Sequence, residues 1–428
     1  MRKLILVVAM FIMFACTLGQ GPAKRATPAM TSAPQPTETQ VVESGSTNPT
    51  GSPATPLASA SGTSADLRGI YVDSNAFPIG AANSTALGAA LHVPGVDGLV
   101  LVLGWDGIEP AMGQYQWATL DQWMNLAVSS HKKVELSIRA DYHTPSWLFQ
   151  PAPGGAGAQP LNFSFTRKPG DTTCLSETIA APWDSAFLSQ WDSMLTALSA
   201  HLKGTGTYND VVLLRLTGIN KDSDELHLPA ETAKSSSAAC ITNAITIWQQ
   251  AGYRPSLLLQ GWDGITGAFQ KSFPDKSFSV AIIASTNPFP PIAEDGSAIT
   301  GTIPNQNLPL LKLASQKFPG RLVIQNNSLY PDLPAQAETI QSAQSLGTMI
   351  AFQTNEDITG QGAACGGKTS NRTTPCTAAT YLAELQTGIY PLGQSNPLRA
   401  QYIEVFALNV NAFPDVIQQA HNELLAQP

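Results

Sequence analysis

The chain has 428 residues, of which 43% are hydrophobic and 13% charged, so it can bury a large core. Its formal net charge is −8 and its basic residues are scattered, which excludes a basic patch for phosphates and makes nucleic acid an unsuitable partner. The 8 Trp, 9 Tyr and 15 Phe suit a neutral, polar ligand with stackable apolar faces, although aromatic residues more often serve in cores.

The N-terminus has the pattern of an export signal. Arg2 and Lys3 precede the apolar run 4–15, which is too short to span a bilayer and is typical of a signal-peptide h-region. The run ends in Ala15-Cys16, and a small residue directly before a Cys resembles a bacterial lipobox. We therefore expect a signal peptide over 1–15, lipidation of Cys16 and an anchored protein at the extracellular face of a bacterial cell membrane. A plain secretory signal and an uncleaved anchor are the alternatives.

The next segment has the composition of a linker. Between Gly21 and Ser64 the chain is rich in Ser, Thr, Pro, Ala and Gly and has almost no large apolar residue. Such a segment cannot offset its ordering entropy by burial. We expect a flexible tether over 16–65, followed by one large folded domain over 66–428.

Four cysteines follow the tether, an even number that in an exported chain favours disulfides. Cys365 and Cys376 flank a short stretch rich in Gly, Lys, Ser, Thr and Asn, where a local disulfide would be useful. We predict Cys365–Cys376 and, by remainder, Cys174–Cys240. A zinc site is the competing interpretation, but no CxxC or HxxxH spacing supports it.

Short apolar runs alternate with longer amphipathic segments through the domain, which predicts repeated βα units, a parallel sheet and a (β/α)8 TIM barrel. The candidate strands are 68–72, 98–103, 133–138, 211–216, 256–260, 278–283, 321–325, 348–352 and 402–406. The candidate helices are 119–129, 186–202, 238–251, 308–318, 334–346 and 377–387. Nine strands exceed the eight of a barrel, so one lies outside the ring or is misassigned.

Polar or aromatic residues follow most of these strands, at the end where barrel enzymes build their sites. A Pro- and Gly-rich stretch over 149–183 is expected to be an insertion after the third strand that walls the cleft. The candidate ligand-binding residues are Asp73, Trp105, Arg139, Asn220, Trp262 and Gln353.

Two segments carry a resemblance to a known family. The stretch WDGIEPAMGQYQW over 105–117, followed by Leu120-Asp121, resembles the second-strand motif of β-galactosidase-type glycoside hydrolases of the retaining barrel clan. The stretch TPSWL over 144–148 is similar to the Pro-x-Trp-Leu element near the end of their third strand. The resemblance implies hydrolysis of a neutral oligosaccharide or polysaccharide by two carboxylates, without cofactor or metal. Trp105 is then expected to present a ring face to a sugar, and Glu109 to brace its loop.

The fourth strand departs from the pattern of that clan. The clan has an adjacent Asn-Glu pair there whose Glu is the acid/base, whereas here Asn220 and Glu225 are separated. The resemblance assigns the acid/base role to Glu225. The alternative is that Asp222, Asp224 and Glu225 form a solvated acidic turn.

The opposing carboxylate has two candidates. Glu404 lies within the apolar run Tyr402-Ile-Glu404-Val-Phe406, where a charge requires a partner or a purpose. It is either the opposing carboxylate or one half of a buried salt bridge to a core arginine. Glu356, after the run 348–352, is the substitute nucleophile if that run is the seventh barrel strand.

Two other classes of function remain open at this point. One is a non-catalytic carbohydrate-binding barrel, because no strand end offers an unmistakable nucleophile. The other is a solute-binding lipoprotein of a transport system, which the tether would also suit. No GxGxxG loop, P-loop or GxSxG elbow stands out, so nucleotide and serine-hydrolase chemistry rank low.

Overall fold

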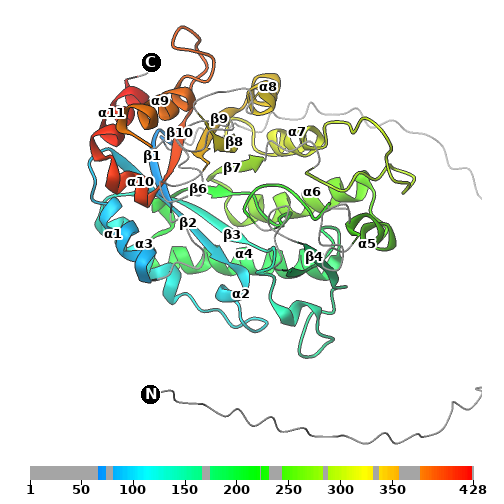
Figure 1. The fold of residues 1–428 in the computed structure, drawn as a ribbon. Helices are drawn as coiled ribbons and strands as arrows, with labels where there is room; N and C mark the ends of the chain where they lie inside the picture. Colours follow the sequence, from blue (N-terminus) through cyan, green and yellow to red (C-terminus); the bar gives the residue numbers. More distant parts are fainter. Residues whose placement is uncertain are drawn as a thin grey trace, which may run out of the picture. The chain divides into compact units, whose positions relative to one another are not determined.

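A computed structural model describes residues 66–73, 81–165, 174–221, 223–230, 243–282, 288–330, 337–355 and 376–426. Within these ranges eight parallel strands close into a barrel in the order β1-β10-β9-β8-β7-β6-β3-β2 (Figure 1). The barrel strands are β1 (Gly69–Asp73), β2 (Val96–Gly104), β3 (Lys133–Arg139), β6 (Val211–Arg215), β7 (Ser277–Ile282), β8 (Leu322–Leu329), β9 (Met349–Thr354) and β10 (Tyr402–Phe406). The expected (β/α)8 barrel is confirmed.

Helices surround the barrel on its outer side (Figure 1). They are α1 (Ala81–Ala90), α2 (Trp105–Ile108), α3 (Ala118–Ser129), α4 (Ser185–Thr205), α5 (Ala244–Gln250), α6 (Pro255–Ser272), α7 (Asn307–Lys317), α8 (Ala337–Leu346), α9 (Ala378–Ile389), α10 (Ala407–Ala412) and α11 (Pro414–Leu425). Each of the six expected helical segments overlaps one of these helices. In the described part of the chain, none of them is long and apolar enough to cross a membrane.

Of the nine expected strands, 256–260 is wrong, because these residues form the start of α6. Pro255 stands at the beginning of this helix, where its fixed φ and missing N–H are tolerated. Leu258, Trp262 and Ile265 are buried at helical spacing. A five-residue apolar run does not distinguish a strand from a buried helix turn. The run 348–352 is therefore in the seventh barrel strand, β9.

The barrel interior has an apolar layer that consists of Leu67, Tyr71, Val100, Leu213, Val323, Ala351 and Tyr402. A glycine makes room for the largest of these rings. A Cβ built on Gly98 of β2 would lie 2.4 Å from Cδ1 of Tyr71, closer than any side chain can tolerate. Towards the C-terminal ends of the strands the inward residues become polar. The apolar outward residues pack against the helices in a separate, larger core.

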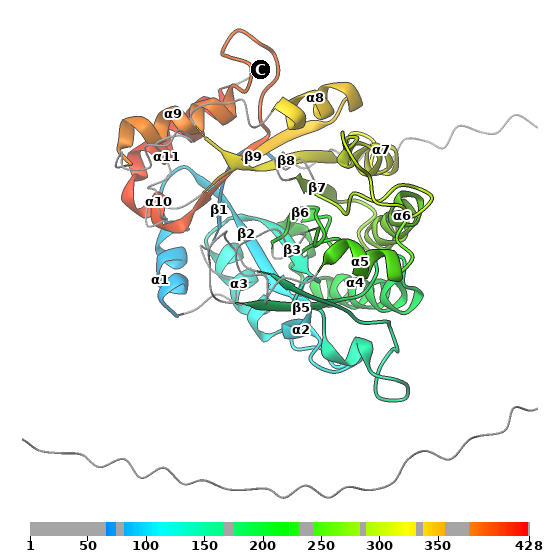
Figure 2. The same ribbon diagram turned by 45° about the vertical axis from the view of Figure 1, so that its right-hand side comes forward.

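The expected insertion after the third strand is present. Between β3 and α4 the chain forms the short helix η1 (Ser146–Phe149) and an antiparallel pair, β4 (Leu161–Phe165) with β5 (Leu175–Ile179). This pair lies outside the barrel ring (Figure 2). The α5 helix contacts β4, and Trp248 of α5 packs on Phe163 with ring centroids 5.3 Å apart.

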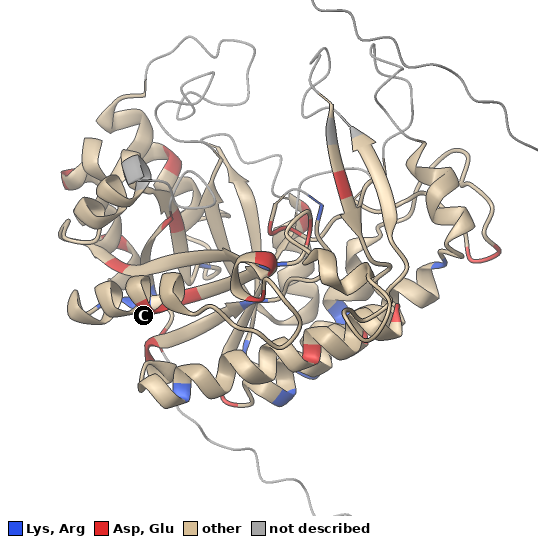
Figure 3. Cartoon of the chain, turned by 90° about the horizontal axis from the view of Figure 1, so that it is seen from below, with Lys and Arg blue, Asp and Glu red and all other residues tan. Residues whose placement is uncertain are grey.

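Charged residues are sparse over the fold and mixed in sign (Figure 3). Most ion pairs among the described residues join partly exposed side chains. An example is Lys271 with Asp192, where Nζ lies 2.7 Å from Oδ2. One cluster differs, because its charges lie inside the barrel.

Candidate active site

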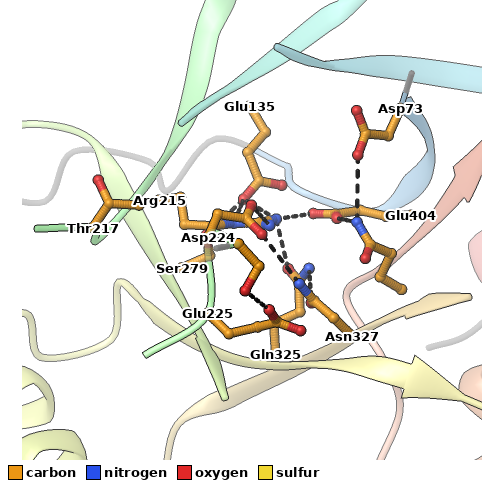
Figure 4. Close-up of polar contacts among 12 residues, drawn as sticks. Asp73, Glu135, Arg215, Thr217, Asp224, Glu225, Ser279, Gln325, Asn327 and Glu404 are labelled. Carbon is orange, nitrogen blue, oxygen red and sulfur yellow. Dashed lines mark hydrogen bonds and ion pairs between the residues drawn. The ribbon is translucent and has the colours of Figure 1, made fainter. Parts of the chain in front are cut away.

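Arg215, the last residue of β6, is the centre of a buried cluster of charges (Figure 4). Its Nε and Nη2 donate to Oε1 of Glu135 on β3 at 3.1 and 2.9 Å. Nη2 also donates to Glu404 on β10, and Nη1 donates to Asp224 in the loop after β6. Arg215, Glu135 and Glu404 have no exposed surface. One buried cation thus contacts three carboxyl groups from three parts of the barrel.

This arrangement shifts the protonation of its members. Burial alone would lower the pKa of Arg215, but Asp224, Glu135 and Glu404 outweigh it and raise that pKa well above the usual range. Burial raises the pKa of Glu404 well above 4.5; Arg215 opposes this shift, and Glu135 adds to it.

Glu404 therefore matches the alternative expected from the sequence, a buried salt bridge to a core arginine. Its second oxygen accepts a hydrogen bond from Nε2 of Gln353 at 2.8 Å. With no exposed surface, its carboxyl group is not available to attack a substrate. The interpretation of Glu404 as the opposing catalytic carboxylate is wrong on this geometry.

Uncharged polar side chains complete the cluster. Oε1 of Gln325 on β8 accepts from Nη2 of Arg215 at 3.2 Å and from the hydroxyl of Tyr402 at 2.6 Å. Ser279 of β7 donates to Oε1 of Glu135 at 2.6 Å. Gln353 also approaches Oδ2 of Asp73, at the end of β1, at 3.5 Å. The candidate residues Gln353 and Asp73 thus lie together, at the polar end of the barrel.

Glu225 lies in the loop after β6, directly before Leu226, which forms a parallel bridge with Ile282 of β7. The amide of Leu216 donates to the carbonyl of Ser279 on β7, and the amide of Leu226 donates to the carbonyl of Ala281, both at 2.8 Å. These acceptors are two residues apart, which is the repeat of a parallel ladder. Leu226 therefore continues the β6–β7 ladder after Leu216, and the intervening residues form an excursion from the strand.

The alternation of side chains along this extended strand places Glu225 on the inner side. Leu216 and Leu226 belong to the outer core, whereas Arg215 points inward. Glu225, directly before Leu226, has the register of an inward position one step beyond Arg215. It is half-buried at the end of the strand.

Asn220 and Glu225, which the sequence separates, are in contact. Nδ2 of Asn220 donates to the backbone carbonyl of Glu225 at 2.9 Å, and Oδ1 of Asn220 accepts from the amide of Gly218 at 2.7 Å. Gly218 has a φ of 110°, which favours glycine. Asn220 therefore braces the excursion rather than extending towards a ligand.

The surroundings of Glu225 favour its protonated form. Burial raises its pKa above 4.5 and the neighbouring Asp224 raises it further, whereas His227, Ser223 and Arg215 act in the opposite direction. Ser223 donates a hydrogen bond to Oε2 of Glu225. A carboxyl group with a raised pKa at a strand end is suited to donate a proton.

Glu356 lies outside the described residues. In the sequence it follows Thr354, the last residue of β9, by two positions. Glu356 was expected to be the substitute nucleophile if the run 348–352 formed the seventh barrel strand. That run lies in β9, which is the seventh barrel strand, so this condition is met.

The two segments that resemble the hydrolase motifs pack on each other. Nε1 of Trp147 donates to the backbone carbonyl of Glu109 at 2.7 Å, and Nε1 of Trp105 donates to Oε2 of Glu109 at 2.8 Å. Oε1 of Glu109 accepts from the amide of Gly113 at 2.7 Å. Glu109 thus braces its loop, as expected. Trp105 has no exposed surface and packs against the rings of Trp147, Phe187 and Trp191, so its expected role in presenting a ring face to a sugar is wrong.

Trp262 is also buried away from the barrel mouth. It lies in α6 rather than after a strand, and its Nε1 donates to the carbonyl of Leu310 in α7 at 3.0 Å. Its side chain has no exposed surface. The assignment of Trp262 to the ligand site is wrong, for the same reason that the strand 256–260 is wrong.

Arg139, at the end of β3, is 7% exposed and donates from Nε to Oδ2 of Asp141 at 2.7 Å. Its guanidinium also lies 5.2 Å from the ring centroid of Tyr142. Tyr142 was not among the candidates. A few large apolar side chains are exposed in the described part of the chain, and Tyr142, which is 38% exposed, is the aromatic one among them.

The sequence contained a signal for the residues that were missed. Glu135 and Arg215 interrupt apolar strand runs in the same way as Glu404. The argument that a charge in an apolar strand requires a partner applies equally to them.

Several other predictions fall outside the described residues. Cys16, the segments 1–15 and 16–65, Cys240 and Cys365 are among them. Cys174 and Cys376 are described, but neither expected pairing can be followed to its partner. The lipidation, the domain limits and both disulfide pairings stay predictions.

Comparison with known proteins gives a likeness in structure only. No protein-family model and no curated protein sequence matches the chain. The catalytic domain of β-amylase from Paenibacillus polymyxa matches with a TM-score of 0.54 and 13% identity, over 85% of this chain and 99% of that one. An intracellular xylanase from Thermoanaerobacterium saccharolyticum matches with a TM-score of 0.48 and 12% identity, over 82% and 89%. At this identity the first likeness concerns the fold alone.

Proposed function

We propose that this protein is a glycoside hydrolase that cleaves a neutral oligosaccharide or polysaccharide with two carboxyl groups, one of which is Glu225. The observation that supports this most is the position of Glu225, a half-buried carboxyl group in the loop that follows the C-terminal end of the fourth barrel strand. Active sites of β/α barrels lie at this end. The likeness in fold to a β-amylase domain and the resemblance of the segment 105–117 favour the same class.

In this proposal Glu225 is the acid that protonates the leaving-group oxygen. Burial raises its pKa, which favours the protonated form that an acid needs. Glu356 is the opposing carboxylate, since it follows the seventh barrel strand in the sequence. A retaining mechanism needs the two carboxyl groups about 5 to 5.5 Å apart, with the second attacking the anomeric carbon.

The test uses the full-length protein and a panel of neutral aryl glycosides and polysaccharides. Glu225→Ala should lose kcat/KM on oligosaccharides but retain kcat/KM on glycosides whose phenol leaves without protonation, because kcat/KM reports the first step and not the later deprotonation of water by the same residue. Glu356→Ala should lose activity on both, and azide should restore turnover by replacing the missing nucleophile. Equal loss on both substrate types in Glu225→Ala would contradict the acid role.

A binding protein is the second candidate, supported by the engagement of Glu404, Glu135 and Asp224 with Arg215. Saturable binding of a sugar by calorimetry, with no turnover on any member of the panel, would favour it. A solute-binding protein with two hinged lobes is not supported, because the described residues include one closed barrel.

We also propose that the protein is exported and anchored through Cys16, with disulfides Cys365–Cys376 and Cys174–Cys240. The signal pattern and the tether composition support the anchor. Mass spectrometry of the mature N-terminus should find a lipid-modified Cys16; an unmodified start further downstream would contradict it. Non-reducing peptide mapping should recover the two cross-linked pairs, and free thiols or another pairing would contradict the disulfides.

A further inference from the structure

The segment that carries Glu225 is attached to the barrel interior through its neighbour, Asp224. Asp224 forms an ion pair with Nη1 of Arg215, and its side chain is 13% exposed. Its other oxygen accepts from Nδ2 of Asn327, on β8, at 3.4 Å. The residue before Glu225 is thus bound to two barrel strands, β6 and β8 (Figure 4).

Arg215 is itself held rigidly. Contacts with Glu135 on β3, Gln325 on β8 and Glu404 on β10 fix its guanidinium from three further strands. Because the planar guanidinium donates in fixed directions, little freedom is left for the Asp224 carboxylate. The position of Asp224 is therefore set by the whole barrel rather than by its own loop.

The other end of the excursion is attached through Thr217, whose hydroxyl donates to the backbone carbonyl of Ile138 on β3. Asn220 binds the carbonyl of Glu225, and Ser223 binds its carboxyl group, but both belong to the excursion itself. Leu226 begins the return to the β7 ladder. Asp224, which lies between Leu216 and Leu226, forms an ion pair with Arg215 in the barrel interior.

We propose that Asp224, held by Arg215, is a positioning residue for Glu225: the ion pair closes the excursion after β6 and fixes the carboxyl group of Glu225 at the barrel mouth. The inference rests on the proposed function of Glu225. It explains why a costly buried charge cluster lies below this site, since the cluster orients the acid as well as filling the barrel.

The pair also sets the electrostatic surroundings of Glu225. Among the described residues, the charged or titratable groups that act on it are Asp224 and His227 on its own segment and Arg215 from β6. From β8, the nearby Asn327 is uncharged. Removing the charge of Asp224 leaves Arg215 and His227 as the dominant neighbours, and both stabilise the ionised form of Glu225.

The test follows the titration of Glu225 directly. Carboxyl ¹³C NMR of the full-length protein, with the Glu225 signal assigned from its loss in Glu225→Gln, gives the pKa without any need for activity. Asp224→Asn should lower the pKa of Glu225 and move the basic limb of the kcat/KM profile to lower pH. Asp224→Glu, which keeps the charge, should match the Glu225 titration of the parent. Asp106→Asn, which removes a half-exposed acid of α2 that pairs with His143 in the loop after β3, is the matched control and should leave the titration unchanged.

An unchanged Glu225 titration in a folded Asp224→Asn variant would overturn the proposal, as would an equal shift in Asp106→Asn. If Asp224→Asn does not fold, the proposal stands or falls with Asp224→Glu, whose titration should match the parent. Failure of the proposed function is a different outcome: the parent protein would cleave no member of the sugar panel, while the NMR titration would still report on the pair.

Discussion

Arg215 on β6 and Glu404 on β10 form an ion pair in which neither side chain has exposed surface, although 189 positions separate them in the sequence. Each strand brings its charge to the barrel interior, where Glu135 and Asp224 join it. A buried ion pair contributes little free energy to stability, but removing one partner destabilises the protein strongly, because the other charge stays buried without compensation.

Loss of the cation should therefore destabilise the barrel strongly. Arg215→Met leaves up to three carboxylates without their partner, and we expect the free energy of unfolding at neutral pH to fall by about 3 to 5 kcal/mol. The loss should be smaller at acidic pH, because protonation removes the unpaired charges. Urea unfolding at several pH values measures both effects. Lys271→Met, which breaks an exposed pair with Asp192, is the control and should cost less than about 1 kcal/mol. A pH-independent loss would contradict the electrostatic explanation.

A second buried acid predicts a pH dependence of stability. Glu384 in α9 is 1% exposed, and its Oε1 has no hydrogen-bond partner among the described residues. Burial raises its pKa well above 4.5. The folded state therefore holds a proton that the unfolded state loses near that value, so stability falls as the pH rises from about 4.5 towards the folded-state pKa.

Glu384→Gln should remove this dependence. As the pH is raised above about 4.5, the parent loses stability, so the free energy of unfolding of Glu384→Gln minus that of the parent should increase steadily. Denaturant titration across the pH range measures this difference. Glu423→Gln, at a half-buried acid of α11 that accepts from Nε2 of Gln386, provides the comparison. Parallel curves for the parent and Glu384→Gln would disprove the explanation.

The close contact of Gly98 with Tyr71 predicts a packing defect. A Cβ at position 98 would lie 2.4 Å from the Tyr71 ring, so Gly98→Ala should lower the free energy of unfolding by about 1 to 3 kcal/mol. The double variant with Tyr71→Leu should recover part of that loss, because the smaller side chain removes the clash. Gly107→Ala, where an added Cβ meets nothing within 4 Å, is the matched control. Equal effects of both alanines would contradict the packing argument.

Under the proposed function we expect Tyr142 to stack on a sugar. It follows β3, is 38% exposed, and lies beside the guanidinium of Arg139. With the proposed hydrolase activity as readout, Tyr142→Ala should raise KM roughly 2- to 12-fold, the value of one aromatic contact, with kcat little changed. Leu308→Ala, at an equally exposed residue of α7, should leave both constants unchanged. A fall in kcat at constant KM would show that Tyr142 acts on the reaction rather than on binding.

The sequence by itself determined the barrel and most of its elements. Alternating apolar runs and amphipathic segments are local patterns, and β/α barrels are built from local units, so eight strands were located correctly. The bracing role of Glu109 followed from its place in a loop motif. The segment 256–260 failed because five apolar residues fit either a strand or a helix, and the packing of Leu258 and Trp262 decided for the helix.

Only the tertiary structure decided what the polar residues do. Trp105 and Trp262 follow apolar runs as ligand-binding residues would, yet packing buries both in the core. Glu404 had two interpretations until Arg215 was found beside it. The separation of Asn220 from Glu225 hid a contact that the excursion after β6 closes. Such pairings depend on which strands become neighbours when the sheet closes, and no local pattern of residues encodes a contact between distant strands.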